Sequence, residues 1–225
     1  MVVAGKIATE EQMPKTRVSH PIFARVYASV SPAMDRGGAA DHRRRLLAGL
    51  TGRVIEVGAG NGLNFAHYPP EVTGVFAVEP EPHLRTIAQR NAARAPVSVE
   101  VVDGVAEQLP ADDATFDAAV VSLMLCSVAD QQTSLREMYR VIRPGGQLRF
   151  FEHVRADTPA LARVQRVLDA TIWPTICGGC HASRDTAAAI GNAGFMIERL
   201  DRFRFPDTRL PLPTSPHIFG VASRL

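Results

Sequence analysis

Three glycines alternate with other residues directly after a short apolar segment that carries one acid. The segment reads VIEVGAGNG, with the acid at Glu56 and the glycines at Gly58, Gly60 and Gly62. Glycine adopts positive φ angles at little cost and lets a ligand approach the backbone amides at the start of a following helix. The G-x-G-x-G spacing differs from the G-x-G-x-x-G of dinucleotide sites and from the phosphate-binding loop. With an acid beside it, the loop favours a cationic ligand over a pyrophosphate, which argues against a dinucleotide oxidoreductase.

A second acid, Glu79, ends the next apolar segment, 17 residues after Gly62. In sheets built from strand–helix–strand units, a carboxylate at this place accepts hydrogen bonds from the hydroxyl groups of a ribose. A strand-end acid on the surface is the alternative, and the glycine loop at the right distance upstream favours the ribose.

The segments around these residues alternate between strands and helices. The expected strands are 53–57, 72–78, 97–102, 116–121 and 147–152, and the expected helices are 82–94, 131–141, 158–170 and 184–191. Such alternation predicts a parallel sheet, and strands that are apolar on both faces require helices on both sides of it. Residues 195–204 and 217–222 are expected to close the sheet as an antiparallel pair. Upstream, residues 20–50 have helical spacing with a break at Gly37 and Gly38, after which Asp41 is expected to cap a second helix.

The composition is that of an ordinary folded domain. The 225 residues are 46% hydrophobic and 21% charged with a formal net charge of +2, which excludes a disordered chain and argues against a nucleic-acid binder. No apolar run reaches the roughly 18 residues of a membrane span, and the N-terminus lacks the apolar core of a signal peptide. We therefore expect a cytoplasmic protein whose three cysteines form no disulfide framework. The basic run at residues 43–45 is interpreted as a solvated helix face.

Four ordered blocks of the sequence resemble the class I S-adenosylmethionine-dependent methyltransferases. They are EVGAGNG, the acid at Glu79, AEQLP and REMYRVIRPGG, and they run from about residue 53 to 153. The resemblance implies an α/β fold with a Rossmann-like, mostly parallel seven-stranded sheet, helices on both faces, an antiparallel last strand and an N-terminal helical lid. It divides the chain into a flexible N-terminus (1–16), a helical lid (17–50) and a domain that binds S-adenosylmethionine (51–225).

The resemblance also implies where the cofactor, S-adenosylmethionine, lies. The glycine loop would cradle its methionine moiety with Glu56 near the ammonium group, and Glu79 would hold the ribose. Residues 104–106 would line the adenine, and residues 122 and 123 would contact the methionine end. The expected cofactor-binding residues are Glu56, Gly58, Ala59, Gly60, Gly62, Asn64, Glu79, Pro80, Gly104, Val105, Ala106, Ser122 and Leu123.

One position departs from the family pattern at the adenine. The family usually has an acid directly before the Ala-Glu pair to bind the adenine amino group, and this chain has Val105 there. Either Asp103 or Glu107 binds the adenine amino group in its place, or backbone groups alone bind it.

Further blocks resemble one branch of the family, the thiol S-methyltransferases. These blocks are NFAHYPP (64–70), LCSV (125–128), RPGGQLRFFEHV (143–154), GGC (178–180) and SPHI (215–218). The mammalian enzymes of this branch carry an N-terminal membrane anchor, and we expect none here. The likeness favours S-methylation of a small thiol by a monomer or homodimer. Two alternatives stay open: an O- or C-methyltransferase of a quinone-, phenol- or polyketide-like acceptor, and a cofactor-binding protein without catalysis.

On the acceptor side, histidines are the expected catalytic groups, because a thiol must lose its proton to become nucleophilic. His153 ends the fifth strand and His181 follows in the segment before the last helix, so both are expected to orient or deprotonate the acceptor. A structural hydrogen bond is the alternative for His153. The residues expected to line the acceptor site are Tyr27, Cys126, Trp173, Cys180 and His217.

The segment from Cys177 to His181 has the C-x-x-C-H spacing of covalent haem attachment. Haem attachment of this kind follows export, and the sequence lacks a signal peptide. A zinc site needs a fourth ligand that the motif does not supply. We therefore expect no metal, and interpret this segment as a glycine-rich loop of the acceptor pocket.

Overall fold

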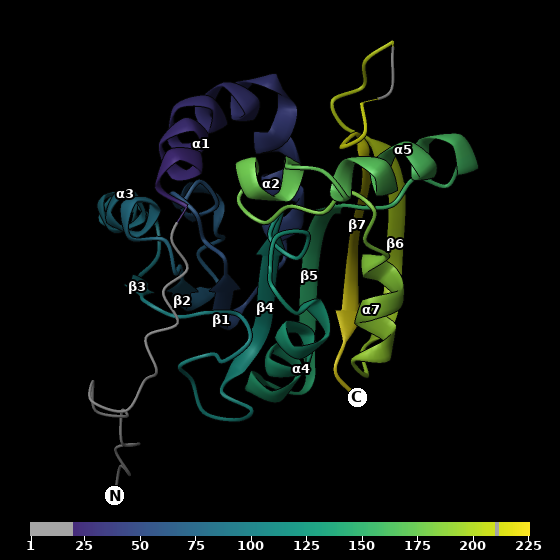
Figure 1. The fold of residues 1–225 in the computed structure, drawn as a ribbon. Coiled ribbons are helices and arrows are strands. Elements are labelled where there is room, and N and C mark those ends of the chain that lie inside the picture. The colour runs from purple at the N-terminus through teal and green to yellow at the C-terminus, as the bar shows by residue number, and fades with distance from the viewer. Residues whose placement is uncertain (1–19, 210–211) are drawn as a thin grey trace, which may run out of the picture.

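The computed structural model describes residues 20–209 and 212–225, so the predicted flexible N-terminus and residues 17–19 of the predicted lid lie outside the described residues. The chain folds around one sheet with helices packed against it (Figure 1). The elements in chain order are α1 (Pro21–Met34), a π-helical turn (Asp35–Ala39), α2 (Ala40–Leu47), β1 (Gly52–Val57), a 3-10 turn (Phe65–His67), β2 (Val72–Val78), α3 (Pro82–Ala92), β3 (Val99–Val102), β4 (Phe116–Ser122), α4 (Gln131–Val141), β5 (Ile142–His153), α5 (Pro159–Asp169), α6 (Trp173–Ile176), α7 (Thr186–Asn192), β6 (Met196–Arg204) and β7 (Pro216–Ser223).

The seven strands lie in the order β3-β2-β1-β4-β5-β7-β6. β1 to β5 pair in parallel, and β7 inserts between β5 and β6 and runs antiparallel to both. This confirms the predicted Rossmann-like sheet with an antiparallel last strand. Because parallel strands end at the same edge, the residues that follow β1, β2, β4 and β5 meet there, and this edge is where ligands bind in such sheets.

Alternating strand residues build two cores, one on each face of the sheet. Ile55 and Val57 of β1 pack in a cluster that includes residues of α4 and α7, such as Leu135 and Ile190. Val54 packs on the opposite face in a cluster that includes residues of α2 and α3. Both faces are therefore covered, as the apolar strands predict.

Two local features differ from the sequence-based expectation. β5 begins at Ile142 rather than at residue 147, because Ile142 already pairs with Phe116 and the register then shifts before the strand continues at Gln147. Residues 144–146 (Pro-Gly-Gly), which the sequence predicts as a turn, lie inside this irregularity, where Gly145 has a φ of 77°. Asp41 lies within the first turn of α2, whose cap position is Ala39, so its predicted capping role is wrong.

Candidate active site

The glycine loop after β1 has the backbone conformation that glycine allows. Gly58, Gly60 and Gly62 have φ angles of 71°, 59° and 77°. The first and third also have no room for a side chain: a Cβ on Gly58 would lie 2.2 Å from Cγ of Met124, and one on Gly62 would lie 2.5 Å from Cε2 of Phe65. The loop is anchored to the next strand, since the amides of Gly58 and Ala59 both donate to the carbonyl of Val78. The positive φ angles and the close packing of this loop thus explain why glycines alternate in the sequence.

Glu79 joins the end of β2 to this loop. Its Oε2 accepts a 2.7 Å hydrogen bond from the amide of Gly60, and its Oε1 accepts one of 2.9 Å from the amide of Glu81. The side chain is 5% exposed. Burial raises the pKa of Glu79 to about 7, although the two backbone donors act in the opposite direction. The carboxylate lies at the strand end that the sequence predicts.

Glu56 is a second buried carboxylate, at the end of β1. It accepts hydrogen bonds from Nδ2 of Asn64 at 2.9 Å and from the hydroxyl of Tyr68 at 2.7 Å. Burial raises the pKa of Glu56 to about 7, while these hydrogen bonds lower it. Two predicted cofactor residues, Glu56 and Asn64, are thus in direct contact, and Tyr68 is a partner that the sequence reasoning missed.

Arg43 corrects the interpretation of the basic run at residues 43–45. The side chain is buried, and its guanidinium pairs with Asp35 at 2.9 Å and donates to Asn64 Oδ1 at 2.9 Å and to Ser122 Oγ at 3.5 Å. Arg44 and Arg45 are exposed, as expected. The sequence did carry a signal, because Arg43 lies three and four residues before the buried pair at 46–47 and therefore shares their helix face.

The helix α1 packs over the glycine loop. A Cβ on Gly60 would lie 3.5 Å from Cε1 of Tyr27, and Ser31 accepts a 2.9 Å hydrogen bond from Asn61. Tyr27, predicted to line the acceptor site, therefore lies at the cofactor loop. Phe23 stacks on Tyr27 with ring centroids 5.7 Å apart, and it contacts the loop before α7, where a Cβ on Gly178 would lie 2.6 Å from its ring. One helix face thus touches both halves of the site.

The predicted adenine segment follows β3 as a tight turn. Val105 pairs with Gln108, and Gly104 is packed so closely that a Cβ would lie 2.9 Å from Val78 Cγ1. Pro80, after β2, accepts a 3.0 Å hydrogen bond from Arg85 through its carbonyl. Arg85 also pairs at 3.0 Å with Asp103, which is 70% exposed.

Glu107, the other acid considered for the adenine amino group, has a different partner. Its carboxylate accepts hydrogen bonds from the amides of Ala129 and Asp130, at the start of α4. This leaves backbone groups of residues 104–106 as the expected partners of an adenine.

Three buried side chains meet on the acceptor side. His153 Nε2 lies 3.1 Å from Cys180 Sγ, and the ligand atoms of Cys126, His153 and Cys180 all lie within 4.8 Å of one another. The exposed fractions are 2%, 7% and 8%. Burial lowers the pKa of His153, but the hydrogen bond and charge of Cys180, together with nearby Glu152 and Asp169, give a net upward shift. Of the predicted catalytic and acceptor residues, the structure brings these three together.

Glu152 is a buried acid that the sequence reasoning missed, and it shapes the turn that carries Cys126. Its Oε1 accepts hydrogen bonds from the amides of Met124 at 2.9 Å and Leu125 at 3.0 Å. Burial raises the pKa of Glu152 to about 7. The turn begins at Leu123, a non-glycine residue with a φ of 57°, so this backbone conformation depends on such external support.

The remaining predicted acceptor residues lie around this cluster rather than in it. His181 Nδ1 is 2.8 Å from the carbonyl of Gly179, and the residue's backbone amide donates to Cys126. His217 pairs with His153 across β5 and β7, with ring centroids 6.1 Å apart, and burial lowers its pKa to about 4. Trp173 begins α6, and its buried Nε1 has no hydrogen-bond partner within residues 20–209 and 212–225.

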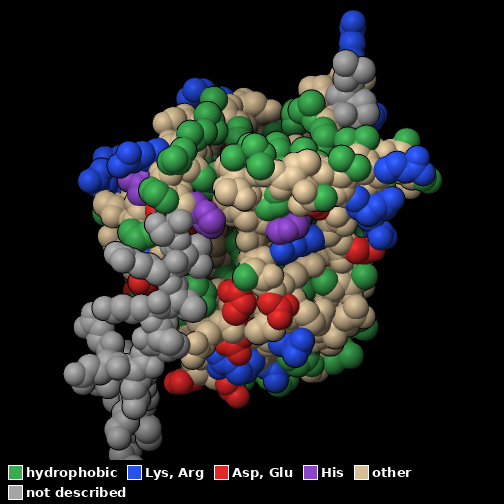
Figure 2. All heavy atoms as spheres, viewed as in Figure 1, with side chains coloured by type: hydrophobic (Ala, Val, Ile, Leu, Met, Phe, Trp, Pro, Cys, Tyr) green, Lys and Arg blue, Asp and Glu red, His purple; other side chains and the backbone are tan. Residues whose placement is uncertain are grey.

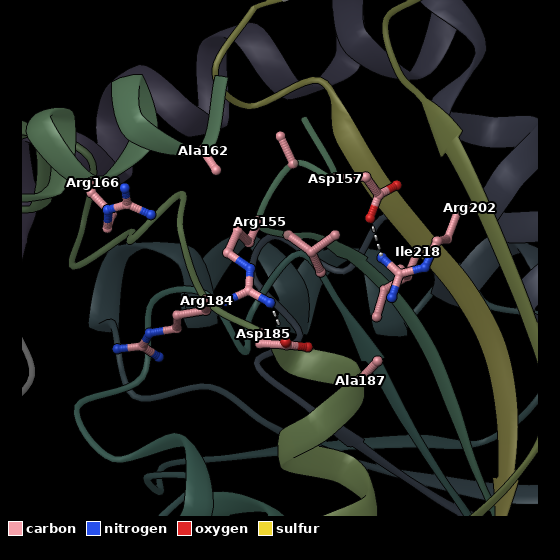
Figure 3. A pocket seen from close by; sticks show the side chains of 11 residues that line it. Arg155, Asp157, Ala162, Arg166, Arg184, Asp185, Ala187, Arg202 and Ile218 are labelled. Carbon is pink, nitrogen blue, oxygen red and sulfur yellow. Dashed lines mark hydrogen bonds and ion pairs between the residues drawn. The ribbon is translucent and has the colours of Figure 1, made fainter. Parts of the chain in front are cut away.

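Two pockets lie beside the end of β5. Both are lined by Val154, which directly follows His153 of the cluster in the sequence. One, of about 620 Å³, lies between α5 and the ends of β6 and β7, and its lining includes Leu161, Val164, Phe203 and His217. The other, of about 310 Å³, is polar and holds the ion pairs Arg155–Asp185 and Arg202–Asp157 (Figure 3).

Hydrophobic side chains also gather on the surface at the end of the molecule where α1 and α5 lie (Figure 2). The exposed apolar residues of these two helices are Ile22, Val26, Val30, Met34, Val164 and Val167.

Similarity to characterised proteins decides the family. The chain is 35% identical over 182 residues to thiol S-methyltransferase TMT1B of Homo sapiens, a match that covers 78% of this chain and 73% of the human protein. The chain belongs to the S-adenosylmethionine-dependent methyltransferases. A family model described as a methyltransferase domain matches residues 55–150 of this methyltransferase. Demethylmenaquinone methyltransferase of Deinococcus radiodurans is 27% identical over 190 residues, covering 83% of this methyltransferase and 73% of that protein.

Solved structures agree on the fold of this methyltransferase. A protein from Thermotoga maritima, described as an S-adenosylmethionine-dependent methyltransferase and possible histamine N-methyltransferase, superimposes with a TM-score of 0.67 at 20% identity, covering 91% of this chain and 98% of that one. A geranyl diphosphate methyltransferase in complex with S-adenosylmethionine gives a TM-score of 0.64 at 13% identity, with 90% of each chain covered. Within the described residues, no helix has the length and apolar character needed to cross a membrane.

Replacing Arg43 should destabilise the fold, because Arg43→Ala leaves Asp35 and Asn64 without their buried partner. Hydrogen bonds to charged groups contribute about 1.5–3 kcal/mol, and we expect a loss in that range from denaturant unfolding, with faster proteolysis within α1. Arg44→Ala, which removes an exposed ion pair, should cost less than about 1 kcal/mol. Equal losses for the two variants would contradict the buried role of Arg43.

Glu56 should make the ligand-free protein less stable as the pH rises. Its pKa is raised from 4.5 to about 7 on folding, so the folded protein binds the proton more tightly than the unfolded chain does. The stabilisation is complete below about pH 4.5 and is lost as the pH rises through 7. In Glu56→Gln the amide oxygen still accepts from Asn64, the amide nitrogen donates to the Tyr68 oxygen, and the titration is removed. Its unfolding free energy should therefore vary less between pH 5 and pH 8 than that of the wild type. The same pH dependence in both proteins would contradict a raised pKa.

Proposed function

We propose that this methyltransferase transfers a methyl group from S-adenosylmethionine to the sulfur of a small thiol. The observation that carries the proposal is the extent of the match to the thiol S-methyltransferases. It covers 78% of the chain, whereas the methyltransferase-domain match covers residues 55–150, so the likeness must include residues outside the cofactor half. Specificity for the acceptor is a property of those outer segments, because the cofactor half is shared by the whole family.

The residues at the sheet edge fit a cationic nucleoside cofactor. A positive-φ glycine loop lies between the buried carboxyl groups of Glu56 and Glu79. We assign Glu79 to the ribose hydroxyl groups, as their hydrogen-bond acceptor, and Glu56 to the ammonium group. When bound, S-adenosylmethionine supplies a methyl group on a positively charged sulfur, which is already an excellent leaving group.

Arg43 is the group that we assign to the cofactor's carboxylate. Its guanidinium lies between Asn64, a predicted cofactor-binding residue, and Ser122, which is predicted to contact the methionine end. Planar guanidinium groups bind carboxylates through paired hydrogen bonds. Asp35 holds Arg43 in place from the lid side, so cofactor binding and lid position would be coupled through one side chain.

The acceptor side of the site has to align a sulfur behind the methyl group and remove its proton. Near-attack alignment at about 3–3.5 Å accounts for much of the catalysis of a displacement with a good leaving group. His153 is the residue that we place next to the acceptor, because it ends β5 at the ligand-binding edge of the sheet and faces two cysteine sulfurs. The apolar pocket of about 620 Å³ that includes His217 is our route for an apolar thiol to enter.

Methylation of a quinone-like carbon or oxygen is the second proposal. The likeness to the menaquinone enzyme of Deinococcus radiodurans spans 83% of the chain, at a lower identity of 27%. The same apolar pocket suits a flat hydrophobic ring, so the acceptor panel must include both classes.

The purified protein should methylate thiols in preference to the other acceptors. The assay incubates it with S-adenosylmethionine and matched thiols, phenols, amines and a reduced naphthoquinone, and detects products by mass spectrometry. Methyl transfer to a phenol or quinone but to no thiol would reject the thiol preference while keeping the enzyme class.

Glu79→Ala should weaken cofactor binding through the loss of charge-assisted hydrogen bonds to the ribose. Such bonds contribute about 1–3 kcal/mol, which corresponds to roughly 5- to 150-fold in the dissociation constant of S-adenosylhomocysteine by calorimetry. Asp103→Ala is the matched control, since Asp103 is an acid after the next strand but is 70% exposed. Equal affinities of Glu79→Ala and wild type would reject the ribose assignment.

A further inference from the structure

Cys126, His153 and Cys180 come from three distant parts of the chain and meet in one buried cluster. Cys126 lies in the turn after β4, His153 ends β5, and Cys180 lies in the loop before α7. Their sulfur and nitrogen atoms lie within 4.8 Å of one another, and Nε2 of His153 lies 3.1 Å from Sγ of Cys180. The C-x-x-C-H motif of the sequence contains a different set of possible ligands, Cys177, Cys180 and His181, and of these only Cys180 belongs to the cluster.

The separations within the cluster match those of ligands around one tetrahedral metal ion. Zinc binds cysteine sulfur at about 2.3 Å and histidine nitrogen at about 2.0–2.1 Å, so ligand atoms around it lie roughly 3.5–3.8 Å apart. The 3.1 Å between Nε2 of His153 and Sγ of Cys180 is somewhat shorter than this, and none of the three separations exceeds 4.8 Å, so the three atoms are close enough to share one ion. Two cysteines and one histidine also form a known type of catalytic zinc site, in which the fourth position stays open for a water or substrate.

We propose that Cys126, His153 and Cys180 bind a zinc ion whose fourth position takes the sulfur of the acceptor thiol. The acceptor half of this proposal rests on the proposed thiol methylation, whereas the binding of zinc does not. Without a metal, the three side chains contact one another through their sulfur atoms, and sulfur is a weak hydrogen-bonding partner.

The backbone around the cluster is fixed by several independent contacts. The amide of His181 donates to the carbonyl of Cys126 at 2.9 Å, which joins the loop of Cys180 to the turn of Cys126. Arg184 donates to the carbonyl of Leu125 at 2.6 Å. Gly179 lies so close that a Cβ would be 2.6 Å from the carbonyl oxygen of Ser127. Metal ligands need this kind of preorganisation, because their geometry must hold before the ion arrives.

The cluster also lies beside the predicted methyl donor. Cys126 follows Met124 by two residues, and the Met124 side chain fills the space next to Gly58 of the cofactor loop. Ser122 and Leu123, predicted to contact the methionine end, precede it in the same turn. A sulfur held at the fourth position would therefore stand on the donor's side of the acceptor site.

Zinc would change the reactivity of the acceptor in a specific way. A thiol that takes the fourth position releases its proton to solvent, because a coordinating thiol is deprotonated. Three thiolates and one dication carry a net charge of about −1, so the bound sulfur stays electron-rich. Its lone pair forms the new bond to the methyl carbon, while the bond from that carbon to the sulfonium sulfur breaks and leaves its electron pair on that sulfur. The product is a neutral thioether, a weaker ligand that departs.

The experiment measures metal binding separately from activity. The full chain is purified with a phosphine reductant and without chelators, and its zinc content is determined by mass spectrometry. It is then depleted, titrated with zinc and, in parallel, loaded with cobalt, whose thiolate charge-transfer absorption reports cysteine ligation. We expect one zinc per chain, and binding weakened about tenfold or more in Cys126→Ser, His153→Ala and Cys180→Ser.

Cys177→Ser is the matched control, because Cys177 shares the C-x-x-C-H segment but lies outside the cluster. It should bind zinc like the wild type. Failure of the wild type to bind zinc stoichiometrically would overturn the proposal even if some variants do not fold. Equal binding by Cys126→Ser and wild type, or a disulfide between Cys126 and Cys180 in place of metal, would also overturn it.

The acceptor half is tested with thiophenol on the cobalt-loaded protein. Coordination of a third sulfur should change the charge-transfer spectrum, and an unchanged spectrum would contradict it. Zinc-depleted protein that methylates thiols at the full rate would overturn the acceptor half of the metal proposal but leave the proposed function intact. Zinc-loaded protein that binds thiophenol but methylates no thiol would uphold the metal site and reject the proposed function.

Discussion

Buried carboxylates at the ends of parallel strands hold the active-site turns in position. Glu79 at the end of β2 accepts the amide of Gly60, and Glu152 at the end of β5 accepts the amides of Met124 and Leu125. Each acid thus fixes a turn that follows a different strand. A buried acceptor of this kind is costly unless its hydrogen bonds are made, so the turns and the acids require one another. The cofactor loop and the turn that carries Cys126 both depend on this arrangement.

The same acids create a site with unusual electrostatics. Burial raises the pKa values of Glu56, Glu79 and Glu152 to about 7. A cation nearby would stabilise the charged form of each carboxylate and lower these pKa values. Arg43 complements the carboxylates by adding one buried cation, which Asp35 pairs on the lid side. The π-helical turn and α2 therefore each contribute a charged side chain to the site.

The acceptor half is built by segments that the family pattern describes less well. Cys126, His153 and Cys180 converge because β4 and β5 end side by side and because the loop before α7 is tied to the turn after β4. α1 contributes through Phe23, which contacts that loop at Gly178 and stacks on Tyr27 at the cofactor loop. The glycine loop and the loop before α7 are thus connected through a single helix face.

The sequence by itself determined the sheet, the order of its elements and the cofactor loop. Strand–helix alternation, apolar strands and positive-φ glycines are local properties, and they predicted the α/β fold and the carboxylates of Glu56 and Glu79 at strand ends. Only the tertiary structure decided the burial and the contacts of Arg43, Glu152 and the cysteine–histidine cluster. Arg43 looked like part of a solvated run because burial depends on what packs against a helix. Cys180 gained its partners from β4 and β5, which are distant in sequence, because contacts between separate segments follow from how the strands are ordered in space.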